Sequence, residues 1–322
     1  MAKNVVQFQK GLSEAAFRSQ YGTEEQCRAA LFSWRWPQGF VCPKCGGTHS
    51  IVLRTRPIQQ CSTCRHQVSL IAGTIFHATK LPLTTWFAAI YHLTQGKNGL
   101  SSLDLARRLG VSHYTAWKIQ HKLMQVMLER DQDKPLTGER IEVDDAYIGG
   151  ERSGGKRGRG SAGKTPFVAA VETTAEGRPV RVKFSRTSAG SRSKAGRCAI
   201  CVPPGRSTAT ASTPSAASTM PGAAIGRSSR APAGRRSGPP PSSGPTPCSA
   251  SDQAPLGRYL KTSLTGTFHA IRDKHVPRYL AQFQYRFNRR YDLPAMIPRL
   301  GWAAVRTPPM PYRLLKLAEV YW

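Results

Sequence analysis

Four cysteines in two pairs have the residue type and spacing of a metal site. Two residues separate Cys42 from Cys45 and Cys61 from Cys64, and fifteen residues lie between the pairs. Each pair lets two thiolates reach one ion, and two pairs complete the tetrahedral four-sulfur site that Zn²⁺ prefers. Because all four positions are filled by protein, the zinc is expected to be structural. The alternative, four buried free cysteines, is disfavoured by the doubled spacing.

Acidic residues on a predicted strand are the second candidate for chemistry. The segment 140–151 has the pattern of a strand that ends in a glycine turn, with Glu142 and Asp144 on one face and Asp145 on the other. A carboxylate in mid-strand is costly unless it faces solvent or a cation. An acid on an exposed edge strand is the alternative interpretation.

The elements that precede this strand predict a helix-turn-helix over 101–123. Ala106 is small where two helices must approach, Gly110 ends the first helix and Ser112 caps the second. The second helix is expected to present a polar and basic face to the major groove of DNA. The residues on that face are His113, Tyr114, Thr115, Lys118 and Lys122. An ordinary helical hairpin with a solvated basic face is the alternative.

The net charge of the whole chain favours a polyanionic partner. The 322 residues carry a formal charge of +29, which fits binding to nucleic acid. A membrane-surface protein is the competing class, but the sequence shows neither a bilayer-spanning apolar run nor a signal peptide. We therefore expect the cytoplasm, where thiols stay reduced and cysteines act as metal ligands or core residues.

The pattern of apolar residues divides the chain into six predicted segments of a multidomain α+β protein. They are N-terminal helices over 1–38, a zinc ribbon over 39–72, the helix-turn-helix over 82–130, a strand-rich segment over 139–187, an anomalous segment over 188–258 and a C-terminal part over 259–322. Between Ser188 and Ala250 there is no Asp, Glu, Leu, Phe, Tyr or Trp. That composition predicts disorder, although a long structureless insert inside one domain is unusual.

Several motifs together resemble the IS1595-type insertion-sequence transposases with an ISXO2-like domain. They are the ribbon, the helix-turn-helix, the run from Val143 to Gly150, the basic loop 158–164 and the run from Tyr285 to Arg290. The resemblance covers 1–187 and 256–322. It implies an RNase H-like α/β domain, incomplete here, whose acids hold two Mg²⁺ ions for DNA cleavage and strand transfer.

The resemblance also implies roles for particular residues. The first Mg²⁺ ligand of the family falls on Asp144. The basic loop is expected to hold DNA phosphates through Lys156, Arg157, Arg159 and Lys164, although a solvated loop is the alternative. The implied partners are double-stranded DNA, as transposon ends and target, and further copies of the chain in a homo-oligomer. No membrane partner is expected, and the implied location is the bacterial nucleoid.

The remaining acids that the resemblance implies are missing, and both positions fall in the anomalous segment. With permitted codons, a shifted frame over Ser207–Ser215 reads His-Gly-Asp-Gly-Leu-Asp-Ala-Phe, which resembles the missing Asp-Gly-Leu motif. A similar shift near Pro245 restores a third-ligand motif. We therefore interpret 188–258 as a compensated pair of frame changes, natural or from sequencing error, with a real low-complexity linker as the alternative.

Two functions remain open from the sequence. The first is a DDE-type transposase, inactive in this copy because two of three metal ligands are gone. The second is a zinc-ribbon and helix-turn-helix protein that binds DNA without catalysis. A zinc-ribbon RNA-binding protein is weaker, because it leaves the helix-turn-helix unexplained.

Overall fold

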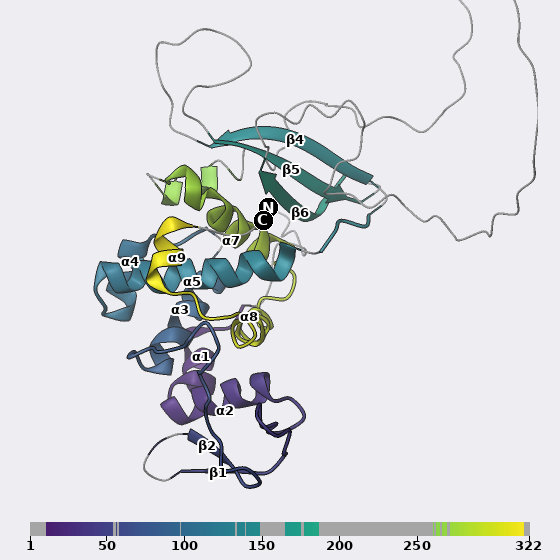
Figure 1. Ribbon diagram of the computed structural model, residues 1–322. Helices are drawn as coiled ribbons and strands as arrows, with labels where there is room; N and C mark the ends of the chain where they lie inside the picture. Colours follow the sequence, from purple (N-terminus) through teal and green to yellow (C-terminus); the bar gives the residue numbers. More distant parts are fainter. Residues whose placement is uncertain are drawn as a thin grey trace, which may run out of the picture.

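The protein has a mixed α/β fold, seen in a computed structural model (Figure 1). The structure describes residues 11–53, 56, 58–96, 98–132, 134–138, 140–148, 165–174, 177–186, 260, 262–264, 266–268 and 271–318. The predicted low-complexity segment and the predicted basic loop both lie outside the described residues. A helical body occupies the middle of the molecule, with a small sheet at one end and a larger sheet at the other.

Two capped helices open the described chain. Helix α1 (Glu14–Tyr21) begins after Ser13, whose hydroxyl accepts from the amide of Ala16 at 3.1 Å. Helix α2 (Glu24–Arg35) begins with a capping box in which Thr23 and Gln26 exchange side-chain and backbone hydrogen bonds. These caps satisfy amide groups that the first turn of a helix leaves without partners.

The small sheet follows α2 and has the strand order β1-β2-β3, all antiparallel. Its strands are short: β1 (Ser50–Val52), β2 (Ile58–Cys61) and β3 (Gln67–Ser69). A separate apolar cluster of Phe40, Cys42, Cys61 and Val68 packs against Phe32 and Trp36 at the end of α2. The Arg35 guanidinium also donates to the Ser69 carbonyl at 3.2 Å, which fastens the sheet to the helix.

Three helices form the centre of the helical body. They are α3 (Leu83–Gln95), α4 (Ser102–Leu109) and α5 (His113–Gln132). Helix α3 is apolar on several sides, in keeping with its place inside the body. The cap of α4 is Ser101, whose hydroxyl accepts from the amide of Asp104 at 3.1 Å.

The larger sheet is an antiparallel meander of β4 (Arg140–Ile148), β5 (Thr165–Thr173) and β6 (Pro179–Arg186). The register pairs Asp144 with Ala169 and Phe184 with the same alanine on the other side. Residues directly opposite one another point to the same face of a sheet. Asp144 therefore shares a face with Ala169 and Phe184.

The C-terminal part adds the short helix η2 (Asp273–His275), then α7 (Val276–Asn288), α8 (Met296–Ala304) and α9 (Tyr312–Leu317). Helix α7 lies between the larger sheet and α5 (Figure 1). Its apolar residues Val276, Leu280 and Phe283 pack on Phe167 and Val171 of β5.

One hydrophobic core joins the two ends of the described chain. It contains side chains of the N-terminal helices, α3, α4, α5, α8 and α9. The contact between α2 and α8 is close, because a Cβ on Gly301 would lie 2.1 Å from the ring of Trp34. Segments that the sequence separates into N-terminal, helix-turn-helix and C-terminal units thus pack as one body.

Candidate metal centre and nucleic-acid interface

The two cysteine pairs converge in the small sheet. The four sulfur atoms all lie within 4.8 Å of one another, and Cys42 to Cys64 and Cys45 to Cys61 are both 3.6 Å apart. A Zn–S bond of about 2.3 Å with tetrahedral angles places sulfurs about 3.8 Å apart. The cluster therefore has the dimensions of a zinc site.

The backbone forms the same turn at both pairs. The amide of Gly46 donates to the carbonyl of Cys42 at 2.9 Å, and the amide of Arg65 donates to that of Cys61 at 3.0 Å. Both Gly46 and Arg65 have positive φ, of 72° and 56°. The turn at the second pair thus places a non-glycine residue in the left-handed region, a strain that the surrounding structure must offset.

The electrostatics of the cluster favour a cation. Hydrogen bonds from the backbone of Cys64, outweighing the opposing effect of burial, lower the pKa of Cys61 to about 6. A hydrogen bond from the backbone of Gly47 likewise lowers the pKa of Cys45. Hydrogen bonds with Cys64 and Cys61, together with burial, outweigh it and raise the pKa of Cys45 to about 12. Neighbouring thiolates oppose one another, and a bound divalent ion removes this cost.

Helices α4 and α5 meet in a three-residue turn. Gly110 has φ of 64°, and the amide of Val111 donates to the carbonyl of Ala106 at 3.1 Å. The Ser112 hydroxyl accepts from the amide of Thr115 at 3.3 Å, so it caps α5. The local features used to predict the turn are all present.

The first turns of α5 carry four of the nine predicted DNA-contacting side chains. His113 and Tyr114 are exposed, whereas Thr115 and Lys118 are half-buried. The Lys118 ammonium lies 4.1 Å from the centre of the Tyr114 ring, a cation–π contact. All four side chains lie within the first two turns of the helix.

Lys122 differs from the predicted outward orientation. Its ammonium donates to the carbonyl of Ile75 at 3.3 Å and lies 5.8 Å from the centre of the Trp86 ring. Burial lowers the pKa of Lys122, and the nearby Lys118 charge adds to this effect. The periodicity places Lys122 one turn beyond Lys118, but the loop at Ile75 covers that part of the helix. The remaining predicted contacts, Lys156, Arg157, Arg159 and Lys164, lie outside the described residues.

Asp144 lies in the middle of β4 and is half-buried. Glu142, on the same face, pairs with Arg140 at 2.9 Å, whereas Asp144 forms no hydrogen bond or ion pair with any described residue. In the part of the chain that the structure describes, Asp144 belongs to no group of three potential metal ligands. The two further acids that the resemblance implies fall in a segment outside the described residues.

Helix α7 holds the outer edge of the larger sheet through side chains that the sequence did not single out individually. Asn288 accepts from the amide of Val182 at 2.8 Å and donates to its carbonyl at 2.9 Å. Gln284 accepts from the amide of Phe184 at 3.1 Å. These bonds satisfy backbone groups that an edge strand otherwise exposes.

The same segment binds the helical body. Arg289 forms two hydrogen bonds with Asp131 at the end of α5, of 2.6 and 2.8 Å, in a largely buried ion pair. Tyr285 donates to the Met296 carbonyl at 3.1 Å, and Arg286 donates to that of Gly96 at 3.1 Å. The run from Tyr285 to Arg290 is thus a structural junction.

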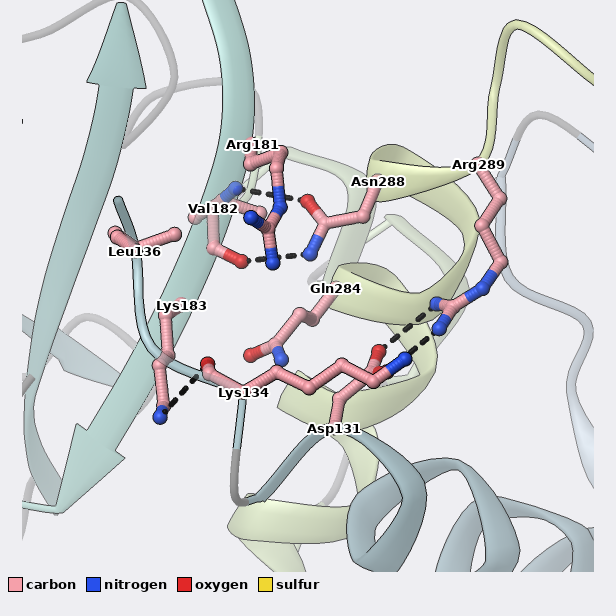
Figure 2. Close-up of a pocket in the computed structure, with 9 residues that line it drawn as sticks. All are labelled: Asp131, Lys134, Leu136, Arg181, Val182, Lys183, Gln284, Asn288 and Arg289. Atoms are coloured by element: carbon pink, nitrogen blue, oxygen red, sulfur yellow. Dashed lines mark hydrogen bonds and ion pairs between the residues drawn. The ribbon is translucent and has the colours of Figure 1, made fainter. Parts of the chain in front are cut away.

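A cavity of about 160 Å³ lies at this junction, between the end of α5, β6 and α7 (Figure 2). Its basic side chains are Lys134, Arg181, Lys183 and Arg289, and Asp131 is its acid. The ion pair of Arg289 with Asp131 crosses one side of the cavity, and the Asn288 amide faces the Val182 backbone on another. The cavity is part of the contact between the sheet and the helical body.

Comparisons with known proteins agree with this architecture. Residues 22–67 match the family described as the transposase zinc-ribbon domain, and residues 135–225 and 256–288 match the ISXO2-like transposase domain. Together the matches cover just over half of the chain. The second match includes 188–225 and leaves 226–255 outside.

A relative from Halobacterium salinarum is described as an uncharacterized protein in transposable element ISH50. It is 25% identical over 146 residues, which are 43% of this chain and 48% of the relative. The matched region thus spans about half the length of that relative. No solved structure matches the chain.

The ribbon and the domain that follows it both match domains of mobile-element transposases. The chain belongs to the IS1595-type family of insertion-sequence transposases, with an ISXO2-like domain. Among the described helices, none combines the length and apolar character needed to cross a membrane.

Proposed function

We propose that this chain descends from a DDE-type transposase and retains DNA binding without catalysis. Its proposed partners are double-stranded transposon ends and target DNA, bound by more than one copy of the chain. A protein with these partners works at the nucleoid. The observation that carries the proposal is the position of Asp144 in the middle of β4, in a sheet that follows a zinc ribbon and a paired-helix unit.

The DNA-binding part of the proposal rests on α4 and α5. Gly110 ends α4 and Ser112 caps α5, which supports a helix-turn-helix in which α5 would be the recognition helix. His113, Tyr114, Thr115 and Lys118 would contact DNA. Lys122 is left out, because its ammonium is bound to the Ile75 carbonyl.

The catalytic part rests on the larger sheet. An antiparallel meander with an acid in mid-strand is what the start of an RNase H-like domain requires. A mid-strand carboxylate without a described partner is costly unless solvent or a cation stabilises it. Asp144 is therefore the residue that would hold the first Mg²⁺ in an active relative.

The described residues do not fit a two-metal centre. Two ions about 4 Å apart need several converging carboxylates, and the described surroundings of Asp144 supply no such group. We therefore derive no catalytic step for this chain and propose that it does not cut or join DNA.

Two changes of reading frame bounding 188–258 are our proposed cause. The family match extends over 188–225, and an unaltered frame would also give such a match. This region therefore decides between the frame changes and a genuine linker. The nucleotide sequence settles the question: an open frame that encodes the Asp-Gly-Leu motif across Ala209 and Thr210 supports the proposal. If no alternative frame encodes that motif, the segment is a genuine linker.

DNA binding is tested with the full chain and a duplex that carries the ends of the element. The logarithm of the binding constant should fall linearly with the logarithm of the salt concentration, because bound cations are released from DNA. Lys118→Ala should weaken binding and make the slope shallower by about 0.9. Arg18→Ala, which removes an exposed charge from α1, is the control.

The outcomes separate the two candidate functions. Absence of binding by the wild-type chain at low salt would refute the helix-turn-helix proposal. Binding together with Mg²⁺-dependent strand transfer by the chain as it stands would instead refute the loss of catalysis.

A further inference from the structure

The last described helix, α9, lies beside the first turns of α5 (Figure 1), although nearly two hundred residues separate them in the sequence. The ring of Tyr312 contacts that of Tyr114, with 5.3 Å between centroids at a steep angle. It also reaches Trp117, with 6.5 Å between centroids. The start of the proposed recognition helix is therefore bordered by a second helix.

Buried contacts fix the orientation of α9. Leu315 has no exposed surface and belongs to the main core. Its carbonyl accepts from the buried guanidinium of Arg278 at 2.8 Å, and the same guanidinium donates to Gln125 of α5 at 2.9 Å. Arg278 thus links α9 to α5 and α7, so the outer face of α9 has a defined direction.

That outer face is basic. Arg313 and Lys316 are exposed, and their spacing of three residues places them on one side of the helix. The Lys118 ammonium lies 5.9 Å from the centre of the Tyr312 ring, so the basic surface of α5 continues onto α9. Neither α9 nor the stretch 113–118 contains an acidic residue.

We infer that α9 is part of the DNA-binding surface and that Arg313 and Lys316 contact backbone phosphates beside the groove that α5 enters. This inference rests on the proposed function. The major groove is about 12 Å wide, which is about the diameter of one helix with its side chains. A helix alongside α5 therefore meets the phosphates at the rim of the groove, where basic side chains add affinity without reading sequence.

The inference is tested in the full chain with the double variant Arg313→Ala and Lys316→Ala. Losing two phosphate contacts should make the salt slope of binding shallower by about 1.8 and lower the affinity roughly equally for matched and unrelated duplexes. The control is Arg18→Ala with Arg28→Ala, which removes the same charge from α1 and α2, where Arg18 is exposed and Arg28 is half-buried. Thermal unfolding of each variant shows whether the fold is intact.

Three results would overturn the inference. An unchanged slope in the double variant, with a reduced slope for Lys118→Ala, leaves the proposed function intact and removes α9 from the surface. Tighter binding by the double variant would mean that α9 obstructs the groove. Equal losses of DNA affinity and of salt slope in the α9 variant and its control would indicate only an effect of net charge. Failure of the wild-type chain to bind duplex DNA would instead refute the proposed function itself.

If Arg313→Ala and Lys316→Ala unfold the chain, Arg313→Gln and Lys316→Gln provide the same loss of charge with longer side chains. The expected change in slope is the same.

Discussion

Two histidines are buried together at the contact of α5 with η2. The centroids of the His121 and His275 rings lie 4.8 Å apart, and the Trp117 ring packs against His121 in a tilted arrangement at 4.1 Å between centroids. Burial lowers the pKa of His121 to about 2, with further lowering from His275 and Arg278. Burial and then the cations Arg278, Lys274 and Arg272 lower the pKa of His275 to about 4. Both imidazoles are therefore neutral in the folded protein.

This pair predicts a loss of stability in mild acid. The unfolded chain takes up protons as the pH falls below about 6.5, whereas the folded chain does not. The free energy of unfolding should therefore decrease from about pH 6.5 toward pH 4, by at most about 1.4 kcal/mol per pH unit for each histidine. His121→Phe should reduce this dependence, as measured by urea unfolding at several pH values. The prediction would be contradicted if the unfolding free energy of His121→Phe depended on pH as steeply as that of the wild type. It would also be contradicted if the exposed control His49→Gln reduced this dependence equally.

The cysteine cluster predicts one bound zinc ion per chain. Cys61→Ser replaces a thiolate ligand with a weak one, so metal content should fall well below one ion and the unfolding temperature should decrease. The matched control is Cys27→Ala, because Cys27 is buried in the main core and lies outside the cluster of four cysteines. Elemental analysis of the purified chains checks this result, and unchanged zinc in Cys61→Ser would remove the cysteine from the site.

At the scale of elements, α7 binds the outer edge of β6, which is an edge strand of the described sheet. Asn288 and Gln284 hydrogen-bond the backbone groups of that edge. Such bonds also block edge-to-edge pairing with other chains. The side chains of α7 thus set the position of the sheet relative to the helical body.

Asn288→Ala should destabilise the protein, because it leaves the amide and the carbonyl of Val182 without their partner. An unmade hydrogen bond of a buried group costs about 1–3 kcal/mol, and the midpoint of urea unfolding should decrease accordingly. Hydrogen exchange at the Val182 amide should also become faster. Asn288→Asp, which can accept but not donate, should restore only the bond to the amide. If hydrogen exchange at the Val182 amide were as slow in Asn288→Ala as in the wild type, the contact would not stabilise the edge of β6.

At the scale of the whole molecule, one core and one ion pair unite distant segments. The core joins α1 to α9, and the pair of Asp131 with Arg289 joins the end of α5 to the end of α7. The proposed recognition helix and the sheet that carries Asp144 are therefore connected through α5 and α7. This connection would hold DNA bound at α5 in a fixed relation to β4.

Catalysis is predicted to be absent in this chain and present in a frame-repaired one. Asp144 alone leaves most of the coordination of a Mg²⁺ ion to water, so the ion is weakly held. Repair across 188–258 would supply the missing acids. The comparison uses end cleavage and strand transfer with Mg²⁺ for three chains: this one, the repaired one, and the repaired one with Asp144→Ala. Activity is expected in the second chain alone.

Each departure from that pattern identifies a different error. Activity in the chain as it stands would show that the segment is not damaged. A repaired chain that keeps its activity without Asp144 would show that another acid holds the metal.

Local features were enough to predict the paired helices α4 and α5, strand β4 and the cluster of four cysteines. The caps at Ser112 and Gly110, the cysteine spacing and the period-two pattern of β4 act over a few residues, and each is satisfied in the fold. Contacts between distant segments could not be predicted from such local features. The inward turn of Lys122 depends on the loop at Ile75, the edge-strand bonds of Asn288 depend on β6, and the basic face of α9 gains meaning only beside α5. Periodicity gives the face of a helix, and only tertiary packing decides what covers that face.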